Sequence, residues 1–401
     1  MPSERFAYFL FPVFIGSHQG FKGDTIMATI FHIKTNDKSQ ICIKPYQLIV
    51  VTSLCFLCNM FGVDYKHVSS QGIHDEVSDT PVVINNSEKW RYDPTSNEAR
   101  LYNVTIDEQV IRELMNNHKL ELLELGGHGL RPETLVTLTK LTPILKKLVI
   151  ADAPRISDES NIGEFIAKQK NLEALEFENT PISDETLKYI SSLPKLKRIH
   201  FSDTDHITCD GLALLSKSKY LVDNLDVLVL LGGREFDNSE DDSSYHFDFM
   251  AKFGNLRELT LVCDSFDGMD IQRFRFVKSL KKIEKLILPS RIDDEFIKDY
   301  VSSLTNLKQL SLQNSKISGA GLKYLLNLPA LEKLDISNSR LNDNDIAVLA
   351  KHQALQFVYI GAPNNITKKG VNYLNAEINK RHPSDIPHVD SYGAISVRDD
   401  L

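Results

Sequence analysis

The chain has 401 residues, of which 42% are hydrophobic and 25% charged, a composition typical of a folded soluble protein. Its net charge is −8 and its Lys and Arg residues are spread along the chain, which argues against a nucleic-acid partner, because such a partner requires a basic surface. The five cysteines are odd in number and irregular in spacing, so we infer neither a disulfide framework nor a zinc site.

The first distinctive element is an uncharged apolar run. Residues 48–63 read LIVVTSLCFLCNMFGV, and the wider segment 44–63 approaches the length of a membrane-spanning helix. Lys34, Lys38 and Lys44 precede the run, and positive charge there favours an N-terminus inside and the rest of the chain exported. The segment is therefore predicted to be a membrane anchor or an export signal, in a single-pass protein whose C-terminal part lies on the non-cytoplasmic side.

A second interpretation of the same run stays open. The run can instead be a buried helix or strand of a cytoplasmic protein, with Cys55 and Cys58 as a buried or lipid-facing pair. In either case residues 1–43 are interpreted as a leader. A start at Met27 in place of Met1 would remove part of that leader from the mature chain.

An internal repeat occupies residues 96–380, after a linker and N-terminal cap at 64–95. The spacing L-x-x-L-x-L recurs with conservative exchanges, in steps of 24 to 31 residues. The first position of each copy is occupied in turn by Leu120, Leu145, Leu172, Leu196, Leu225, Leu256, Ile283, Leu307, Leu331 and Leu355. A degenerate copy with Ser96, Ala99 and Leu101 precedes them, which makes about eleven repeats.

The second half of each repeat predicts a helix. In Ile182-Ser-Asp-Glu-Thr-Leu187 and Ile317-Ser-Gly-Ala-Gly-Leu322 an aliphatic residue is followed by a short polar turn and then by apolar residues three or four apart. Ser or Thr ahead of a helix can accept hydrogen bonds from its first-turn amides. Asp158, Asp184 and Asp294 are expected at the same ends, where the helix dipole favours negative charge.

One strand and one helix cannot bury these leucines alone, so the copies must stack on one another. The predicted fold is an α/β solenoid with parallel strands on the concave face and helices on the convex face, because helices are wider than strands and bend the stack. A final helix is expected at 367–380. Residues 381–401 contain Pro383 and Pro387 and are predicted to form a flexible tail.

The repeat consensus resembles a known family. The segments ISDETLKYISSLPKLKRIHF and ISGAGLKYLLNLPALEKLDISNSRL are similar to the I-[ST]-D-x-G-L type of leucine-rich repeat, as in bacterial leucine-rich-repeat proteins and the repeat halves of F-box/leucine-rich-repeat proteins. The resemblance covers residues 96–380 and implies a horseshoe-shaped solenoid. Its F-box branch also implies a three-helix module opening with Leu-Pro ahead of the repeats, a pattern that residues 64–95 do not contain.

The concave face changes character along the array. On each strand, the two positions that flank the second leucine point away from the core. The early repeats place mixed charges there, namely Glu124, Lys147, Glu173, Glu176, Glu178, Lys197, Arg198 and His200. Later repeats place apolar residues and one threonine there, namely Val227, Val229, Leu231, Thr260, Val262, Ile287, Phe357 and Tyr359.

We expect these eight residues to be exposed and to bind a protein partner, because apolar side chains aligned across adjacent strands form a contact patch. Two alternatives stay open. Either the N-terminal apolar run or the long insertion of the fifth repeat covers them within the same chain, or some strands are assigned in the wrong register.

Catalysis and metal binding are not expected. Gly126–Gly129 is glycine-rich but follows a repeat strand where a turn is needed, and it matches no phosphate-binding spacing. Residues 234–248 hold six acidic side chains without EF-hand spacing, which indicates a solvated loop. The chain also contains no H-E-x-x-H and no G-x-S-x-G.

The predicted function is therefore a non-catalytic protein-binding scaffold that uses the concave face of the solenoid and is attached to a membrane. It has no catalytic residues, metal, cofactor or small-molecule substrate. The alternative is a cytosolic adaptor, or the substrate receptor of an F-box-like ubiquitin ligase.

Overall fold

The computed structural model of the chain divides into two compact units, Met1–Pro81 and Val82–Leu401, which are described separately. The structure describes residues 97–383 except 103–105, 107, 141–143, 233–246, 263–269 and 362–364, together with 389–390 and the backbone of three N-terminal strands.

In the first unit the described residues form a small antiparallel sheet. Strand β1 (Phe6–Val13) pairs with β2 (Met27–Asn36), which also pairs with β3 (Gln40–Ile41). All three strands lie within the segment expected to be a leader. The predicted apolar segment 44–63 and the linker 64–95 lie outside the described residues, and among those that are described no helix combines the length and apolarity needed to cross a membrane.

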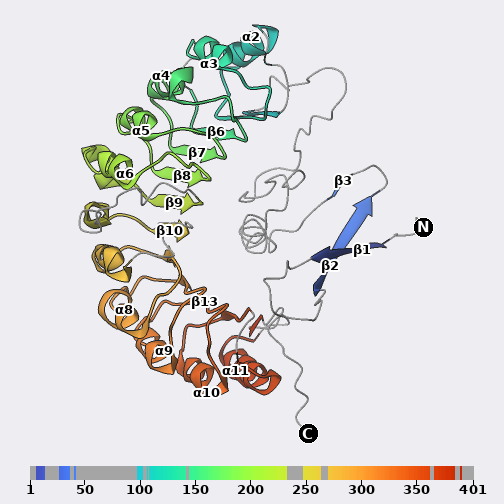
Figure 1. Cartoon of the computed structure of the whole chain (residues 1–401), viewed down its shortest axis with the longest axis vertical. Helices are drawn as coiled ribbons and strands as arrows, with labels where there is room; N and C mark the ends of the chain where they lie inside the picture. The colour runs from blue at the N-terminus through green and yellow to red at the C-terminus, as the bar shows by residue number, and fades with distance from the viewer. Residues whose placement is uncertain are drawn as a thin grey trace, which may run out of the picture. The chain divides into compact units, whose positions relative to one another are not determined.

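The second unit contains one parallel sheet in which every strand lies beside the next strand of the sequence (Figure 1). The described strands are β4 (Glu98–Tyr102), β5 (Leu122–Gly126), β6 (Lys147–Ala151), β7 (Ala174–Glu178), β8 (Arg198–Ser202), β9 (Val227–Leu231), β10 (Glu258–Val262), β11 (Lys285–Ile287), β12 (Gln309–Ser311), β13 (Lys333–Asp335), β14 (Phe357–Tyr359) and β15 (Val389–Asp390). The strand order confirms the predicted solenoid. Strand β15 comes from the segment expected to be a flexible tail.

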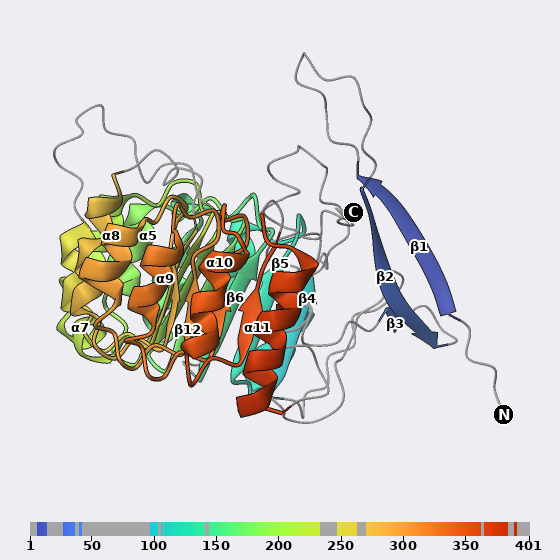
Figure 2. The same ribbon diagram turned by 90° about the horizontal axis from the view of Figure 1, so that it is seen from below.

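Helices follow the strands and cover one side of the sheet (Figure 2). The described α-helices are α2 (Glu108–Asn116), α3 (Pro132–Leu138), α4 (Ile162–Lys168), α5 (Asp184–Ile190), α6 (Cys209–Leu215), α7 (Lys219–Asn224), α8 (Asp294–Phe296), α9 (Gly319–Leu325), α10 (Asp343–Ile346) and α11 (Lys368–Arg381). Strands line the inner side of the curved array and helices its outer side, as predicted (Figure 1).

The second leucine of each repeat forms a continuous row through the core. Along the sheet the paired residues are Ala99, Leu123, Leu148, Leu175, Ile199, Leu228, Leu259, Leu286, Leu310, Leu334 and Val358. Each of these side chains is buried, and none is more than 3% exposed. The register inferred from the repeat spacing is therefore confirmed from β4 to β14. Ala99 occupies the position assigned to the degenerate first copy.

The residue after a strand often adopts a left-handed backbone conformation, which turns the chain toward the helix layer. Gly127 has φ 83°, and Asp152, Asn179 and Asp203 have φ between 44° and 51° at the same place in the next three repeats. Glycine, aspartate and asparagine tolerate this conformation best. The glycines of Gly126–Gly129 therefore serve the turn predicted for them.

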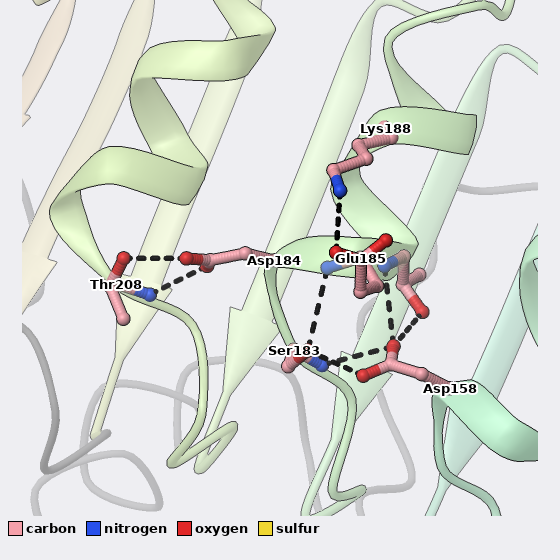
Figure 3. A network of polar contacts seen from close by, with 7 residues as sticks. Asp158, Ser183, Asp184, Glu185, Lys188 and Thr208 are labelled. Carbon is pink, nitrogen blue, oxygen red and sulfur yellow. Dashed lines mark hydrogen bonds and ion pairs between the residues drawn. The ribbon is translucent and has the colours of Figure 1, made fainter.

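Aspartates at helix N-termini link several pairs of neighbouring repeats (Figure 3). Ser183 caps α5, and the Asp184 carboxylate beside it accepts hydrogen bonds from the Thr208 backbone N at 2.9 Å and from its Oγ1 at 2.6 Å. Asp158 accepts the corresponding bonds from the backbone N and Oγ of Ser183. Equivalent bridges join Asp294 to Ser318 and Asp343 to Thr367.

The same bridge explains the glycine of the I-[ST]-D-x-G-L pattern. A Cβ on Gly211 would lie 1.8 Å from Asp184 Oδ1, and one on Gly321 would lie 2.1 Å from Asp294 Oδ1. Where Thr186 replaces the glycine, its Oγ1 donates to Asp158 at 2.5 Å. Opposite a bridging aspartate, this position therefore takes either a residue without a side chain or one that binds the carboxylate.

The repeats in the middle of the array are built differently. Cys209 stands where the preceding repeat has the bridging Asp184, and it is buried. In the repeats that begin with β9 and β10 the described helical segments are the 3₁₀ turns Phe247–Lys252 and Ile271–Ser279. Their phenylalanines pack together, with the rings of Phe247 and Phe274 centred 5.5 Å apart. Aromatic packing thus fills the core where the helix layer is irregular.

Candidate protein-binding surface

The sheet brings six of the eight predicted site residues together. Val227, Val229 and Leu231 lie on β9, Thr260 and Val262 on β10, and Ile287 on β11. Two rows cross these strands, since Thr260 pairs with both Val229 and Ile287 while Leu231 pairs with Val262. We call Val227, Val229, Leu231, Thr260, Val262 and Ile287 the central apolar patch.

Phe357 and Tyr359 lie apart from this patch. They are on β14, and β12 and β13 separate that strand from β11. Phe357 pairs with Lys333 and Tyr359 with Asp335, so their nearest neighbours on the sheet are charged. Both side chains are half-buried. The two aromatic residues therefore do not extend the central apolar patch.

The patch is less exposed than expected. Val227 is 8% and Thr260 is 4% exposed, so both are buried, whereas Val229, Leu231, Val262 and Ile287 are half-buried. Val227 lies between the long side chains of Arg198 and Glu258 in the paired strands. The expectation that all eight residues are exposed was therefore wrong for Val227 and Thr260. The accessible apolar surface comes from the other four members.

A row of alternating charges crosses the sheet where the strands begin. The residue after the first leucine is, in chain order, Glu121, Lys146, Glu173, Lys197, Asp226, Arg257, Glu284, Lys308 and Glu332. Neighbours form ion pairs, including Lys146–Glu121 at 2.7 Å, Lys197–Glu173 at 2.9 Å, Arg257–Glu284 at 2.9 Å and Lys308–Glu284 at 2.7 Å. Most of the charges in this charge row are therefore paired within the molecule. The strict alternation is visible in the sequence, but only once the repeats are aligned.

Shallow recesses accompany the charge row. One of about 240 Å³ is lined by Val227, Gln309 and charged residues that include Arg257 and Lys308. Another of about 270 Å³ lies among Glu121, Lys146, Glu173 and their neighbours. Among the described residues, no group of three or more His, Cys, Asp or Glu side chains is placed to hold a metal ion.

Acidic side chains collect near the other ends of β5 to β8. We call Glu124, Asp152, Glu178 and Asp203 the acidic strip. Burial, and to a lesser extent repulsion from Asp152 and Asp203, raises the pKa of Glu178 to about 7. Burial and the nearby Glu124 also raise the pKa of Tyr102. Glu124 and Glu178 were predicted to belong to an ordinary charge-mixed surface. Asp152 and Asp203 were not predicted to lie on that face, because they come after the strands.

His200 lies between the acidic and apolar regions. It pairs with Glu176 of β7 on one side and with Val229 of β9 on the other. Burial lowers its pKa, so the ring is neutral near pH 7. Its Nε2 is buried and has no hydrogen-bond partner within the part of the chain that the structure describes. An uncharged ring with an unused nitrogen therefore borders the central apolar patch.

Comparisons with known proteins support the fold. No protein-family model matches the chain, and no curated protein matches it. Among solved structures, the chain is similar to the Rad7 and Elc1 complex of yeast, with a TM-score of 0.50, 18% identity, and coverage of 71% of this chain and 74% of that one. An internalin (inlF) of Listeria monocytogenes has 18% identity and a TM-score of 0.41, with coverage of 74% and 86%. The fold is a leucine-rich-repeat solenoid.

Proposed function

We propose that the chain is a non-catalytic scaffold that binds another protein through the central apolar patch on the concave face of its sheet. The observation that supports this proposal is the alignment of half-buried apolar side chains on three adjacent strands. On a sheet face that points away from the helix layer, such side chains gain most by burial against a partner. Leucine-rich-repeat folds also present an extended concave surface suited to protein ligands.

Two segments of the same chain could instead cover the central apolar patch, and both lie outside the described residues. The apolar run 48–63 is one, and the insertion 233–246 after β9 is the other. The variants that test partner binding also test these two alternatives. A patch that is covered within the chain would capture no partner, whether or not its residues are substituted.

The test replaces apolar side chains of the patch with charged ones. Val229→Asp with Leu231→Asp places two carboxylates on β9 while sparing the buried Val227. We expect the full-length double variant to lose the proteins that the wild type captures in an affinity pull-down, because a carboxylate cannot be desolvated against an apolar partner. Val136→Asp on α3 is the matched control, since Val136 is exposed outside the concave face.

Two outcomes decide the matter. Loss of captured proteins in the Val229/Leu231 variant alone supports the proposal, provided that both variants keep the wild-type thermal transition. If the charged pair unfolds the protein, Leu231→Ala with Val262→Ala removes apolar surface without adding charge. An unchanged set of captured proteins in the folded patch variant contradicts the proposal.

Membrane attachment through residues 48–63 is a separate part of the proposal. It is supported by the uncharged composition of that run and the preceding lysines. Resistance of the full chain to carbonate extraction is the expected result. Complete release by carbonate would instead favour a cytosolic adaptor, an alternative for which the likeness to Rad7, a protein solved in complex with Elc1, is the supporting observation.

A further inference from the structure

The central apolar patch and the acidic strip adjoin on one face. A single row of paired residues runs from Glu178 on β7 through Ser202 on β8 to Leu231 on β9 and Val262 on β10. These four strands are consecutive neighbours in the sheet (Figure 1). Since adjacent strands lie about 4.8 Å apart, Glu178 and Leu231 are separated by roughly 10 Å. One short segment of a partner can therefore contact both.

Among the residues that the structure describes, no neighbouring cation balances the negative charge at Glu178. Other concave-face glutamates have one, since Glu176 pairs with Lys147 at 2.8 Å and Glu258 pairs with Lys285 at 2.5 Å. Among the described residues Glu178 forms no ion pair, and the groups that act most strongly on it are acidic: Asp152, Asp203, Glu124 and Glu176. Ionised Glu178 is thus unfavourable in the isolated protein, and a cation brought beside it would relieve the repulsion.

The boundary between the two regions also has unused hydrogen-bonding capacity. His200 stands one strand from Glu176 and one strand from Val229, with its Nε2 buried and unpartnered in the described structure. A buried polar atom without a partner is costly, and a partner whose docking turns the ring outward would recover that cost by supplying a hydrogen bond. The unpartnered Nε2 of His200 therefore favours a partner at the boundary between the two regions, and this observation does not depend on the acidic strip.

We infer that the partner segment is a polypeptide carrying a Lys or Arg that pairs with Glu178 and a large apolar side chain that packs on Leu231 and Val262. This inference rests on the proposed function and specifies the chemistry of its partner. The cation forms a charge-assisted hydrogen bond with a carboxylate whose surroundings are already acidic. The apolar side chain is buried on the half-buried residues Leu231 and Val262. An acidic partner segment would meet Asp152, Asp203 and Glu178 and would be repelled.

The pairing also sets the direction of a pH effect. A cation at Glu178 favours its ionised form, so binding releases a proton at pH values where Glu178 of the free protein is protonated. Affinity therefore rises with pH through the pKa near 7. Tyr102, Asp152 and Asp203 face the same region, and protonation of His200 at lower pH would further oppose a cation.

The experiment uses a phage-displayed library of random peptides as the probe, selected on the immobilised full-length protein. Enriched peptides are then synthesised and their affinities measured by calorimetry. We expect them to contain Lys or Arg together with large apolar residues. Glu178→Gln with Asp203→Asn should weaken their binding roughly tenfold or more, the range expected for loss of a charge-assisted contact. The control variant Glu164→Gln with Glu185→Gln removes two exposed charges from the helix layer, and it should leave the affinity for these peptides unchanged.

The outcomes separate this inference from the proposed function. Enrichment of neutral or acidic peptides whose binding is abolished by Leu231→Asp would overturn the inference and leave the proposed function intact. Cationic peptides that bind the Glu178/Asp203 variant as tightly as the wild type would also overturn it. Peptides whose binding does not depend on Leu231 at all would overturn both.

Discussion

Glu176 and Glu178 are two residues apart on the same strand and face the same side of the sheet, yet their surroundings differ. A lysine of the neighbouring strand pairs with Glu176, whereas Glu178 lies among acids and is desolvated by burial. Repulsion and desolvation both favour the protonated form, which is why the pKa of Glu178 rises to about 7. The difference between Glu176 and Glu178 therefore comes from their positions in the stacked array and not from the residue type.

This shift predicts how stability depends on pH. The pKa of Glu178 is higher in the folded than in the unfolded chain, so its contribution is fully present below the ordinary pKa of 4.5 and is lost as pH rises through about 7. Glu178→Gln should therefore be more stable than the wild type at about pH 8 and should lose that advantage near pH 5. Urea unfolding at the two pH values measures the effect, and an equal difference at both would contradict it.

At this scale the sequence predicts burial better than exposure. The leucines follow from spacing, because a repeat can satisfy them only by stacking. The prediction that Val227 and Thr260 are exposed was wrong. Their exposure depends on the side chains of neighbouring strands, which are about 24 to 31 residues away in the chain. Asp152 and Asp203 were missed for a similar reason, since their left-handed backbone carries them beyond the strand pattern.

Neighbouring helices are joined by carboxylates as well as by apolar packing. Asp184, at the first position of α5, binds the backbone N and Oγ1 of Thr208, which is the cap of α6. The sequence predicts the Ser and Thr caps and the acidic first turn from local helix chemistry. It does not predict the bridge, because only stacked helices bring the carboxylate of one repeat to the cap of the next. The bridge also explains why Gly211 is a glycine, since a side chain there would collide with the Asp184 carboxylate.

Removal of the bridge should cost more than removal of an ordinary surface acid. We expect Asp184→Ala to lower the free energy of unfolding by about 2 kcal/mol, because two hydrogen bonds to a charged group are lost. Asp210→Ala is the control in the first turn of α6, where the aspartate is exposed, and it should change stability by about 0.5 kcal/mol or less. Chemical denaturation of both variants gives the comparison. Equal values would mean that Asp184 acts only through the helix dipole.

Across the whole molecule, the charge row and the central apolar patch have different roles. The charge row joins several pairs of neighbouring repeats by ion pairs, so most of its charges are already paired within the molecule. Exposed pairs of this kind add little stability, typically about 1 kcal/mol or less each. The patch lies where the array changes its helical packing, between the α3–α6 and α8–α11 segments. The fold was predictable from the repeat period. The identity of the partner was not, because it depends on which side chains the stacking leaves accessible.

Partner contact at the patch is measured most directly by photo-crosslinking. A benzophenone amino acid in place of Val229 puts the reactive group on the concave face, and the same replacement at Val136 puts it on α3 of the helix layer. Irradiation of the full chain in its native extract should give a discrete covalent adduct with another polypeptide from position 229 and none of that adduct from position 136. The same adduct from both positions, or from position 136 alone, would contradict binding through the central apolar patch.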